Sequence, residues 1–475
     1  MPPRRVAIVG GGITGAVAAS ELSSAGLDVT LFDQGRRGPG GRASHRSVDV
    51  TDHAVLPDDE PPADGATLEF DHGCQFFRAD TDAMKAMVRR PSPHVILSCA
   101  AHPRLLSPQV ADWCARGWAA PWEARFGRVA GSGGAPCEPG AADFFGLPGS
   151  SAPVYVGVGG MQRLPRAILA GCTASVRRGV RVAGLVSSPA GWILLGTEGI
   201  AAFHDTPEAQ AAGAEKNALA EPFDAVLMTD VSSSFGDWHR AGAGLPEEFA
   251  SRVRDRVRVP LFSCMVAFAE PTQLPLDGIT VEGDGALWFA ARSQSKPGVV
   301  AGAGVAECWT LVSTPGYAVA EIDETPMQDK SGAFVPQSDG YLNSGPGPTL
   351  AAAFAAAVKP LLPTPGGELP RQVYLQAQRW GSAMPAPAGA GGRDAKGRGE
   401  TTREVLGVAY EAAVPPLLFE APSDSDEYVA DDKLRLYYAG DYCSRRPPGF
   451  ETAALSGLAA ARHVRGMLSG AVAGS

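Results

Sequence analysis

The chain opens with a hydrophobic pattern that predicts a strand, a helix and a second strand. Arg5–Gly10 is a short apolar run that ends in glycines, as a buried strand does before a tight turn. Small and apolar residues continue from Ile13 to about Ala25, which predicts a helix with Gly26 as its C-cap. A second apolar strand is predicted at Asp28–Phe32. This order indicates a parallel βαβ unit.

The middle of the chain contains short apolar runs separated by turn residues, which predict strands. Three are expected, at Gly179–Val186, Gly191–Gly196 and Phe223–Thr229. His204–Glu221 is rich in alanine and polar residues and is interpreted as a surface insertion. Pro260–Glu270 alternates apolar and small residues, as expected for a strand of another sheet.

Two later segments have the composition of loops. Thr314–Pro348 contains Gly, Pro, Ser and Asp throughout, and Met384–Gly399 is of low complexity. Neither can bury enough surface to offset the entropy lost on ordering, so both are predicted to be loops. Lys433–Ala439 then predicts a strand, and the small residues of Glu451–Leu468 predict a helix.

The strongest local signal is the pattern Gly10-x-Gly12-x-x-Gly15 between the first strand and the first helix. Gly10 permits the tight turn, Gly12 lets the backbone approach a pyrophosphate, and Gly15 lets the helix pack closely on the strand. Asp33 ends the second strand, about 20 residues further on, where a carboxylate can bind ribose hydroxyls. The pattern predicts a dinucleotide at the helix N-terminus, against the alternative of a glycine turn in an ordinary α/β unit.

A second glycine loop, Gly38-Pro39-Gly40-Gly41-Arg42, follows the acidic residue. Its glycines, Gly41 among them, would let the backbone approach the same ligand again, and Arg42 can neutralise a pyrophosphate as a bidentate donor. The alternative is a solvated basic loop formed by Arg36, Arg37 and Arg42. The first motif does not distinguish NAD from FAD, whereas this second loop favours FAD.

A third signal lies at the other end of the chain, where a strand closes on Gly440-Asp441 and a helix of small residues follows Gly449. This offers a second helix N-terminus to the same cofactor, facing the pyrimidine edge of an isoalloxazine, where negative charge collects on reduction. The alternative is a helix whose small residues only permit tight packing. Beside the two earlier motifs, the cofactor interpretation is preferred.

The segments VAIVGGGITG, LFDQG, GPGGRAS, FDHGCQFF, VGVGGMQRL and YYAGDYC…GFETAALSGLAAA, in this order, resemble the renalase-like branch of the FAD-dependent amine oxidase superfamily. The resemblance spans nearly the whole chain. It implies an α/β fold in which a discontinuous FAD-binding Rossmann-like domain is joined to an α+β substrate domain of amine oxidase type. The implied FAD-binding domain comprises residues 1–78, 155–240 and 403–475, and the substrate domain comprises residues 79–154 and 241–402.

The resemblance also implies contacts to a non-covalently bound FAD. The residues implied are Gly10, Gly12, Thr14 and Gly15 at the pyrophosphate, Asp33 at the adenosine ribose, Arg42 at the phosphates, Gly73, Cys74 and Gln75 beside the isoalloxazine, Val182 at the adenine, and Gly440 and Asp441 at the ribitol and pyrophosphate. Tyr155–Ala170 resembles the family helix that returns the chain to the FAD domain.

Composition and charge narrow the class of partner. At 475 residues the chain exceeds what one hydrophobic core usually serves. The 41 Lys and Arg minus the 51 Asp and Glu give a net charge of −10, which disfavours nucleic acids and anionic membranes. We find no apolar run near the ~18 residues of a bilayer span, and MPPRR leads directly into a strand without a signal peptide. The expectation is a soluble, intracellular protein, cytoplasmic by default, or organellar if a presequence was removed.

The chain offers no residue set that stands out as a catalytic centre. Its eight cysteines show no metal-like spacing, so we expect reduced thiols and no metal site. Cys443 lies near Asp441 and is interpreted as not tethered to a flavin, because family enzymes with a tether place the cysteine elsewhere. His72 is interpreted as a neutral, structural histidine in preference to a general base. Flavin chemistry needs mainly orientation, a dry pocket and charge at the reduced ring, so we nominate no catalytic residue.

The absence of a second G-x-G-x-x-G between a strand and a helix indicates that substrate and electron donor share one pocket. Its candidate aromatic residues are Phe76, Phe77, Trp288 and Trp380. The chain departs from the renalase pattern after Arg379-Trp380, where Gly-Ser-Ala-Met follows, so the family's substrate specificity does not carry over.

The function expected is that of an FAD-dependent oxidoreductase which takes hydride from a small reduced organic substrate and passes electrons to dioxygen. By resemblance to renalase, that substrate could be a misreduced isomer of NAD(P)H. Alternatives of the same class are a flavin amine oxidase and a desaturase of isoprenoid or polycyclic compounds. An alternative of a different class is a non-catalytic FAD-binding scaffold, suggested by the large insertions.

Overall fold

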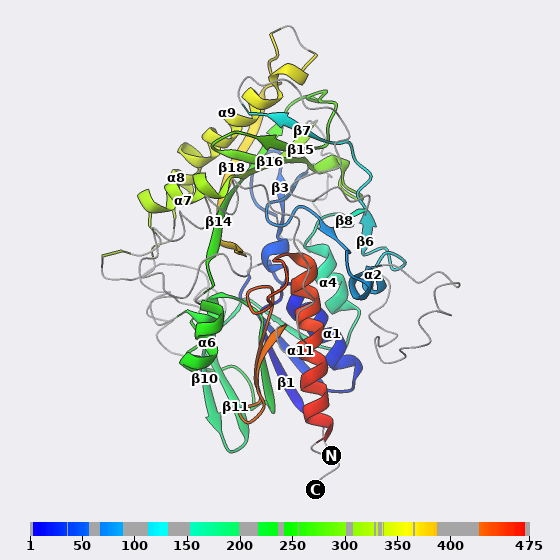
Figure 1. The fold of residues 1–475 in the computed structure, drawn as a ribbon, viewed down its shortest axis with the longest axis vertical. Coiled ribbons are helices and arrows are strands. Elements are labelled where there is room, and N and C mark those ends of the chain that lie inside the picture. Colours follow the sequence, from blue (N-terminus) through cyan, green and yellow to red (C-terminus); the bar gives the residue numbers. More distant parts are fainter. Residues whose placement is uncertain are drawn as a thin grey trace.

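The computed structural model describes residues 3–35, 37–56, 67–88, 113–131, 153–198, 217–235, 242–254, 256–300, 307–326, 329–330, 335, 337–363, 366–386 and 427–470. Within these ranges the chain has a mixed α/β fold built on two large sheets, one in the lower half of Figure 1 and one in the upper half. The predicted fold class is confirmed, and the residue bounds of the two domains stay a prediction.

The lower sheet has the strand order β19-β20-β13-β1-β2-β9, and its strands are parallel except β19 at the edge. The predicted βαβ unit is confirmed as β1 (Arg5–Val9), α1 (Ile13–Ser24) and β2 (Asp28–Asp33). The other strands are β9 (Ser175–Arg178), β13 (Ala225–Met228), β19 (Tyr428–Asp431) and β20 (Leu436–Ala439). Strands from both ends of the chain therefore share one sheet.

The two faces of the lower sheet are covered by different elements. Val6 and Ile8 pack with α1 and two further helices, whereas Ala7 and Val9 pack with a small antiparallel sheet. Alternate side chains of a strand point to opposite faces, which is why four consecutive residues of β1, Val6–Val9, are apolar. The covering elements are α4 (Arg163–Ala170) and α11 (Phe450–Gly470) on one face, and β10 (Val180–Ser188), β11 (Gly191–Glu198) and β12 (Asn217–Ala218) on the other. Helices α1 and α11 lie side by side (Figure 1).

The upper sheet has the order β18-β14-β17-β16-β15-β7 and is antiparallel except for the β15–β7 pair. Its strands are β7 (Phe126–Ala130), β14 (Arg258–Phe268), β15 (Gly278–Glu282), β16 (Leu287–Arg292), β17 (Glu307–Ser313) and β18 (Gln372–Pro385). One face is covered by α7 (Pro315–Glu324), α8 (Asp339–Ser344) and α9 (Pro346–Val358), which pack on buried residues such as Phe262 and Trp309.

Smaller elements connect the two sheets. They are the pair β3 (His45–Asp49) and β4 (Thr67–Asp71), the three strands β5 (Phe77–Arg78), β6 (Ala119–Pro121) and β8 (Val154–Gly157), the helices α2 (Asp82–Val88) and α6 (Glu247–Arg254), and the short 3₁₀ turns η1 (Gly41–Ala43), η3 (Ser232–Ser234), η4 (Ser293–Ser295) and η5 (Lys359–Leu361).

The prediction of a loop at Thr314–Pro348 is wrong, because this stretch contains α7, α8 and the start of α9. Thr314 and Ser338 are N-caps whose side chains accept hydrogen bonds from Tyr317 N and Tyr341 N. Proline follows at the first position of α7 and of α9. Serine, threonine and proline start helices as readily as they form loops, and here they start helices.

Three smaller predictions also need correction. Tyr155–Ala170 is not one helix, because β8 extends to Gly157 and α4 begins at Arg163; Gly159 and Gly160 between them have φ of 74° and 126°. Residues 217–218 of the predicted insertion form β12. Residues 384–385 of the predicted low-complexity loop end β18, and its residues beyond 386 lie outside the described part of the chain.

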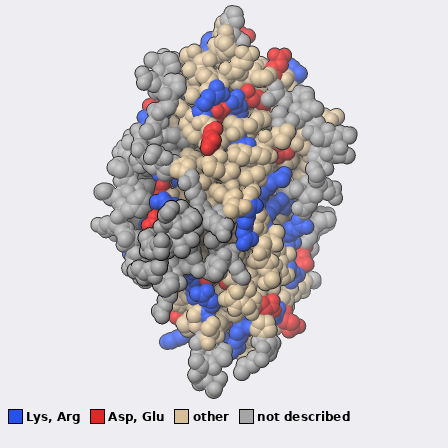
Figure 2. All heavy atoms as spheres, turned by 90° about the vertical axis from the view of Figure 1, so that its right-hand side faces the viewer, with Lys and Arg blue, Asp and Glu red and all other residues tan. Residues whose placement is uncertain are grey.

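On the face drawn in Figure 2, most of the described surface is formed by residues other than Lys, Arg, Asp and Glu. Figure 2 shows a face on which Lys and Arg form a short band near mid-height, with Asp and Glu scattered around it. Among the described helices, none has the length and hydropathy needed to cross a membrane.

Candidate functional site

A cavity of about 1520 Å³ runs from the lower sheet to the upper sheet. It is larger than the ~300–1,000 Å³ of most small-molecule sites. Every residue predicted to bind cofactor or substrate lines this cavity except Gly15 and Gly440. The two ends are named after the ligands expected from the sequence: the nucleotide end, beside Asp33 and Val182, and the substrate end, beside Trp288 and Trp380.

The first glycine loop lies at the nucleotide end. A Cβ on Gly10, at φ 108°, would approach Thr229 Oγ1 to 2.6 Å, and a Cβ on Gly15 would lie 2.0 Å from the Gly10 carbonyl oxygen. Gly15 therefore acts by packing α1 on the loop. A Cβ on Gly12 would instead meet open space. Thr14 lines the cavity in the first turn of α1, which has no side-chain cap, so its N–H groups are available to an anionic ligand.

Asp33 is buried at the carboxyl end of β2. Its carboxylate accepts hydrogen bonds from Gly11 N at 2.8 Å and from Gly35 N at 2.9 Å. Burial raises the pKa of this carboxyl although both N–H donors oppose the shift. Val182 of β10 lines the same end of the cavity. Asp33 thus ties the first glycine loop to the loop that follows β2.

The second glycine loop lies directly against the first. Gly40 N donates to the Gly11 carbonyl oxygen at 2.9 Å, and a Cβ on Gly41 would lie 3.2 Å from Gly12 Cα. Gln162, just before α4, donates to the Pro39 carbonyl oxygen at 2.8 Å. The two loops form one backbone-lined wall with room for a ligand beside Gly12.

Arg42 and Asp441 form an ion pair across the cavity wall. The guanidinium donates to the Asp441 carboxylate at 2.5 and 2.8 Å and to the Ala383 carbonyl oxygen at 3.1 Å. Burial lowers the pKa of Arg42, but the Asp441 carboxylate raises it by more than this, so the guanidinium is charged. Both residues line the cavity, and their charges cancel.

The C-terminal segment packs directly on the first helix. A Cβ on Gly457 would lie 2.4 Å from the Thr14 carbonyl oxygen, and Gly440 N donates to Ser456 Oγ at 2.8 Å. Gly449 and Phe450, at the start of α11, line the cavity. The prediction that the two ends of the chain converge is confirmed.

The Gly73–Gln75 turn forms the middle of the cavity wall. Cys74 N donates to the Arg42 carbonyl oxygen at 2.7 Å, and no Cβ fits at Gly73, since it would lie 2.1 Å from that oxygen. Burial raises the pKa of the Cys74 thiol to about 11, so the sulfur is protonated. The Gln75 side chain donates to the Asp71 carbonyl oxygen.

A buried charge network holds this turn from behind. Asp71 accepts from His45 Nδ1, Lys296 Nζ and Met161 N, each at 2.8 Å. His45 Nε2 lies 2.6 Å from Glu69, and Lys296 also donates to Gln75 Oε1 at 3.1 Å. Burial alone would lower the pKa of His45, but its two carboxylates raise it to about 9. The network therefore holds two cations and two carboxylates.

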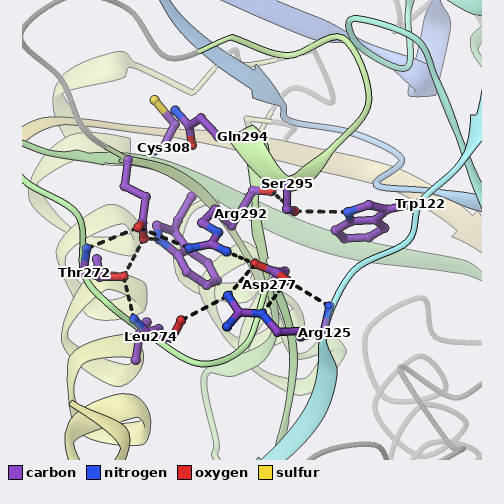
Figure 3. A network of polar contacts seen from close by, with 11 residues as sticks. Trp122, Arg125, Thr272, Leu274, Asp277, Arg292, Gln294, Ser295 and Cys308 are labelled. Atoms are coloured by element: carbon purple, nitrogen blue, oxygen red, sulfur yellow. Dashed lines mark hydrogen bonds and ion pairs between the residues drawn. The ribbon is translucent and has the colours of Figure 1, made fainter. Parts of the chain in front are cut away.

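The turn that carries Lys296 is fixed by a second charge network, shown in Figure 3. Asp277 pairs with Arg292 and, at 3.1 Å, with Arg125. Ser295 Oγ donates to the Arg292 carbonyl oxygen at 2.6 Å and accepts from the Trp122 indole at 3.0 Å. The Trp122 ring also lies 5.3 Å from Lys296 Nζ. The residues of this network do not line the cavity. They hold the turn that positions Lys296.

The four predicted aromatic residues have different surroundings. Trp380 donates its indole N–H to the His72 carbonyl oxygen at 2.9 Å and stacks on the His72 ring at 5.5 Å. Phe77 is buried and stacks on Phe450 at 4.5 Å, so it is mainly a core residue. Phe76 packs edge-on against Phe289 at 6.1 Å. Trp288 lines the cavity and packs on the hydrophobic core.

The structure bears on the predictions that His72 is neutral and that Cys443 is unmodified. Burial lowers the pKa of His72 well below its usual value, so the ring is neutral as predicted. Burial raises the pKa of Cys443, so its thiol is protonated, and the six described cysteines form no disulfide. Among the described residues no group of three or more His, Cys, Asp or Glu could hold a metal.

Sequence analysis missed the side chains behind and beyond the predicted turn. They are His45, Arg46, Lys296, Gln376 and Gln378. His45 and Arg46 follow the second glycine loop, and this position beside a predicted ligand-binding loop could have identified them. Lys296 and the glutamines reach the site only through the pairing of distant strands, so no local pattern identifies them.

Comparisons with known proteins agree with this architecture. The model of the NAD(P)-binding Rossmann-like domain family matches residues 8–91. No curated protein matches the sequence. The crystal structure named "Putative protoporphyrinogen oxidase from Exiguobacterium sp. 255-15" has a TM-score of 0.50 and 13% identity, over 98% of this chain and 99% of that chain.

Two further structures resemble the chain more weakly. An oxidoreductase from Methanosarcina mazei has a TM-score of 0.45 and 12% identity, over 98% of this chain and 100% of that one. A fatty acid isomerase from P. acnes that produces CLA has a TM-score of 0.47 and 9% identity, over 99% of each chain. The chain therefore carries a Rossmann-like NAD(P)-binding domain and has the fold of the Exiguobacterium protein. The relation to renalases stays a prediction.

Proposed function

We propose that this protein is an FAD-dependent oxidoreductase that takes hydride from a small reduced organic substrate, with dioxygen as electron acceptor. The observation that carries the proposal is the single continuous cavity. It is lined at one end by the Rossmann glycine loops and at the other by side chains of the second sheet. A dinucleotide held at the first end would extend toward a substrate held at the second.

The residues at the nucleotide end fit FAD. The uncapped N-terminus of α1 beside Gly12 suits the pyrophosphate, and Asp33 suits the adenosine ribose. The Gly73–Gln75 turn and the start of α11 would lie along the isoalloxazine. FAD is preferred to NAD(P) because the second glycine loop and the C-terminal segment extend the lining beyond the first βαβ unit. The names of the Exiguobacterium and Methanosarcina proteins, an oxidase and an oxidoreductase, are in keeping with this class.

When bound, FAD supplies a two-electron acceptor for hydride that dioxygen can reoxidise, with hydrogen peroxide as the product. The chain's own contribution is orientation, desolvation and electrostatics. With the isoalloxazine bound along the Gly73–Gln75 turn, the N-terminus of α11 would supply partial positive charge near the ring, where negative charge collects on reduction. The buried Asp71 network and the partly exposed Asp277 network would fix the turn between the nucleotide end and the substrate end.

The test is spectroscopic. Purified protein is mixed with FAD, desalted and examined for bound flavin absorbance, then mixed anaerobically with reduced nicotinamide isomers, with amines and with polyenes. We expect one flavin per chain and bleaching by one class of hydride donor, reversed by air with release of hydrogen peroxide. Protein that stays colourless after reconstitution would overturn the proposal. Bound flavin that no donor bleaches would favour the scaffold alternative.

A further inference from the structure

Arg46 is a buried cation on the wall of the cavity. It lies on β3 next to His45, and its exposed fraction is 6%. Because neighbouring side chains on a strand point to opposite faces, His45 faces the Asp71 network while Arg46 faces β18 of the upper sheet.

The hydrogen bonds of Arg46 go to neutral groups. Nη1 donates to Gln376 Oε1 at 2.6 Å and Nη2 to Gln378 Oε1 at 3.4 Å, while Nε is buried without a partner. Among the described residues no carboxylate forms an ion pair with it. Lys296 and Arg42, in contrast, each pair with an aspartate, Asp71 and Asp441.

A buried charge without a counter-ion is costly, because the protein does not replace the hydration that the charge loses. Amide oxygens solvate a guanidinium but leave its charge in place. Of its five N–H donors, two bond the glutamines, and the neutral Tyr374 hydroxyl also lies beside the guanidinium. Arg37 also lines the cavity and adds positive potential, whereas Arg379 points to the other face of β18 and bonds the Thr325 carbonyl oxygen. Asp339, which lines the cavity too, is exposed. An anion brought by a ligand would complete the site.

The neighbouring groups describe the rest of such a ligand. Gln376, Gln378 and Trp380 alternate along β18 without a bulge, so they share the face toward the cavity. Trp380 stacks on His72, whose Nδ1 is buried without a partner and whose ring is neutral. The stacked rings of Trp380 and His72 therefore form a flat aromatic wall, two residues along β18 from Gln378.

We infer that the substrate end of the cavity binds a carboxylate carried by a planar, conjugated molecule, with Arg46 as the group that recognises the carboxylate. One buried arginine held between two neutral glutamines suits one negative charge, whereas phosphate dianions are usually bound by two or more arginines that converge on them. A protonated amine would be repelled. The inference rests on the proposed function, since it makes this carboxylate part of the hydride donor.

The experiment follows ligand binding through the absorbance of the bound flavin. FAD-loaded protein is titrated with benzoate, its neutral isostere benzamide, and phenyl phosphate. We expect benzoate to perturb the spectrum with saturation, and benzamide to bind at least tenfold more weakly. In Arg46→Gln the benzoate affinity should fall to that of benzamide with the FAD content unchanged, and Arg46→Lys should be intermediate because it keeps charge without the planar fork.

Arg78→Gln is the matched control, because Arg78 lines the same cavity but already pairs with Asp80 at 2.6 Å. Its benzoate affinity should stay within about twofold of wild type. Equal binding of benzoate and benzamide by the wild type would overturn the inference even if Arg46→Gln does not fold. Loss of FAD from Arg46→Gln would assign the guanidinium to the cofactor and also overturn it, as would tighter binding of phenyl phosphate than of benzoate.

The two proposals fail differently. If the protein takes up FAD but does not discriminate the three probes, the carboxylate inference fails and the proposed function stands. If the protein takes up no FAD, the proposed function fails. Thermal denaturation of the same colourless protein would then show whether benzoate raises Tm more than benzamide does. If it does, and if Arg46→Gln abolishes the difference, the carboxylate site alone is supported.

Discussion

The two ends of the cavity are built from different materials. At the nucleotide end the wall is backbone: the glycine loops, the N-terminus of α1 and N–H groups that are pinned by Asp33. At the substrate end the wall is made of side chains from β3 and β18, such as Arg46, Gln378 and Trp380. At Gly10 and Gly15 the backbone wall has no room for a Cβ, and it presents the same peptide groups whatever side chains surround it. The side-chain wall, in contrast, can be changed one residue at a time. The first end suits a constant cofactor, and the second suits a specific substrate.

The largest effect is expected where the two ends join. Lys296→Met would leave Asp71 with one cation instead of two in a buried site, and breaking such a pair typically costs about 3–5 kcal/mol. Urea unfolding should show this loss, whereas Lys85→Met, which removes an exposed pair with Asp82, should cost less than about 1 kcal/mol. An equal loss in both variants would mean that the network does not join the two ends.

Glycines of the nucleotide end should separate packing from ligand binding. Gly15→Ala places a Cβ 2.0 Å from a carbonyl oxygen and should cost about 1–3 kcal/mol in unfolding free energy. Gly12→Ala meets open space, so its stability should stay near wild type while its FAD affinity falls at least tenfold. Gly466→Ala on the exposed face of α11 should leave the FAD affinity unchanged and should raise the unfolding free energy by up to about 1 kcal/mol, because alanine favours a helix. Unchanged FAD affinity in Gly12→Ala would remove this loop from the cofactor site.

A pH effect should arise from His45. Its pKa is raised from 6.5 to about 9, so its contribution to stability is complete below pH 6.5 and is lost as the pH rises through 9. The unfolding free energy should therefore fall by about 2 kcal/mol between pH 6.5 and pH 9.5. His45→Gln should flatten that dependence. The same slope in the variant would show that another group titrates.

The smallest effect is expected at the substrate end. Trp380→Phe keeps an aromatic ring but loses the indole N–H that bonds the His72 carbonyl oxygen and, at 3.2 Å, Ser263 Oγ. Stability should fall by about 1 kcal/mol. FAD content should not change, so a variant with less bound FAD would place Trp380 at the nucleotide end instead.

The same difference between the two ends explains what the sequence could predict. The Gly10–Asp33 unit and the C-terminal strand and helix have local patterns, and each was found. Lys296 was not, because a lysine reaches Asp71 only through the folding of residues more than two hundred positions apart. The helices in Thr314–Pro348 were missed for another reason: their capping residues are also loop formers, and only packing on the upper sheet decides between the two.

The convergence of the two chain ends has a consequence for biosynthesis. β1 lies between β2 and β13, and β20 closes the other side of β13, while α11 covers α1. A ribosome makes the first glycine loop hundreds of residues before it makes Asp441 and Gly457. Until that later segment has been made, the nascent chain therefore exposes only half of the proposed nucleotide site.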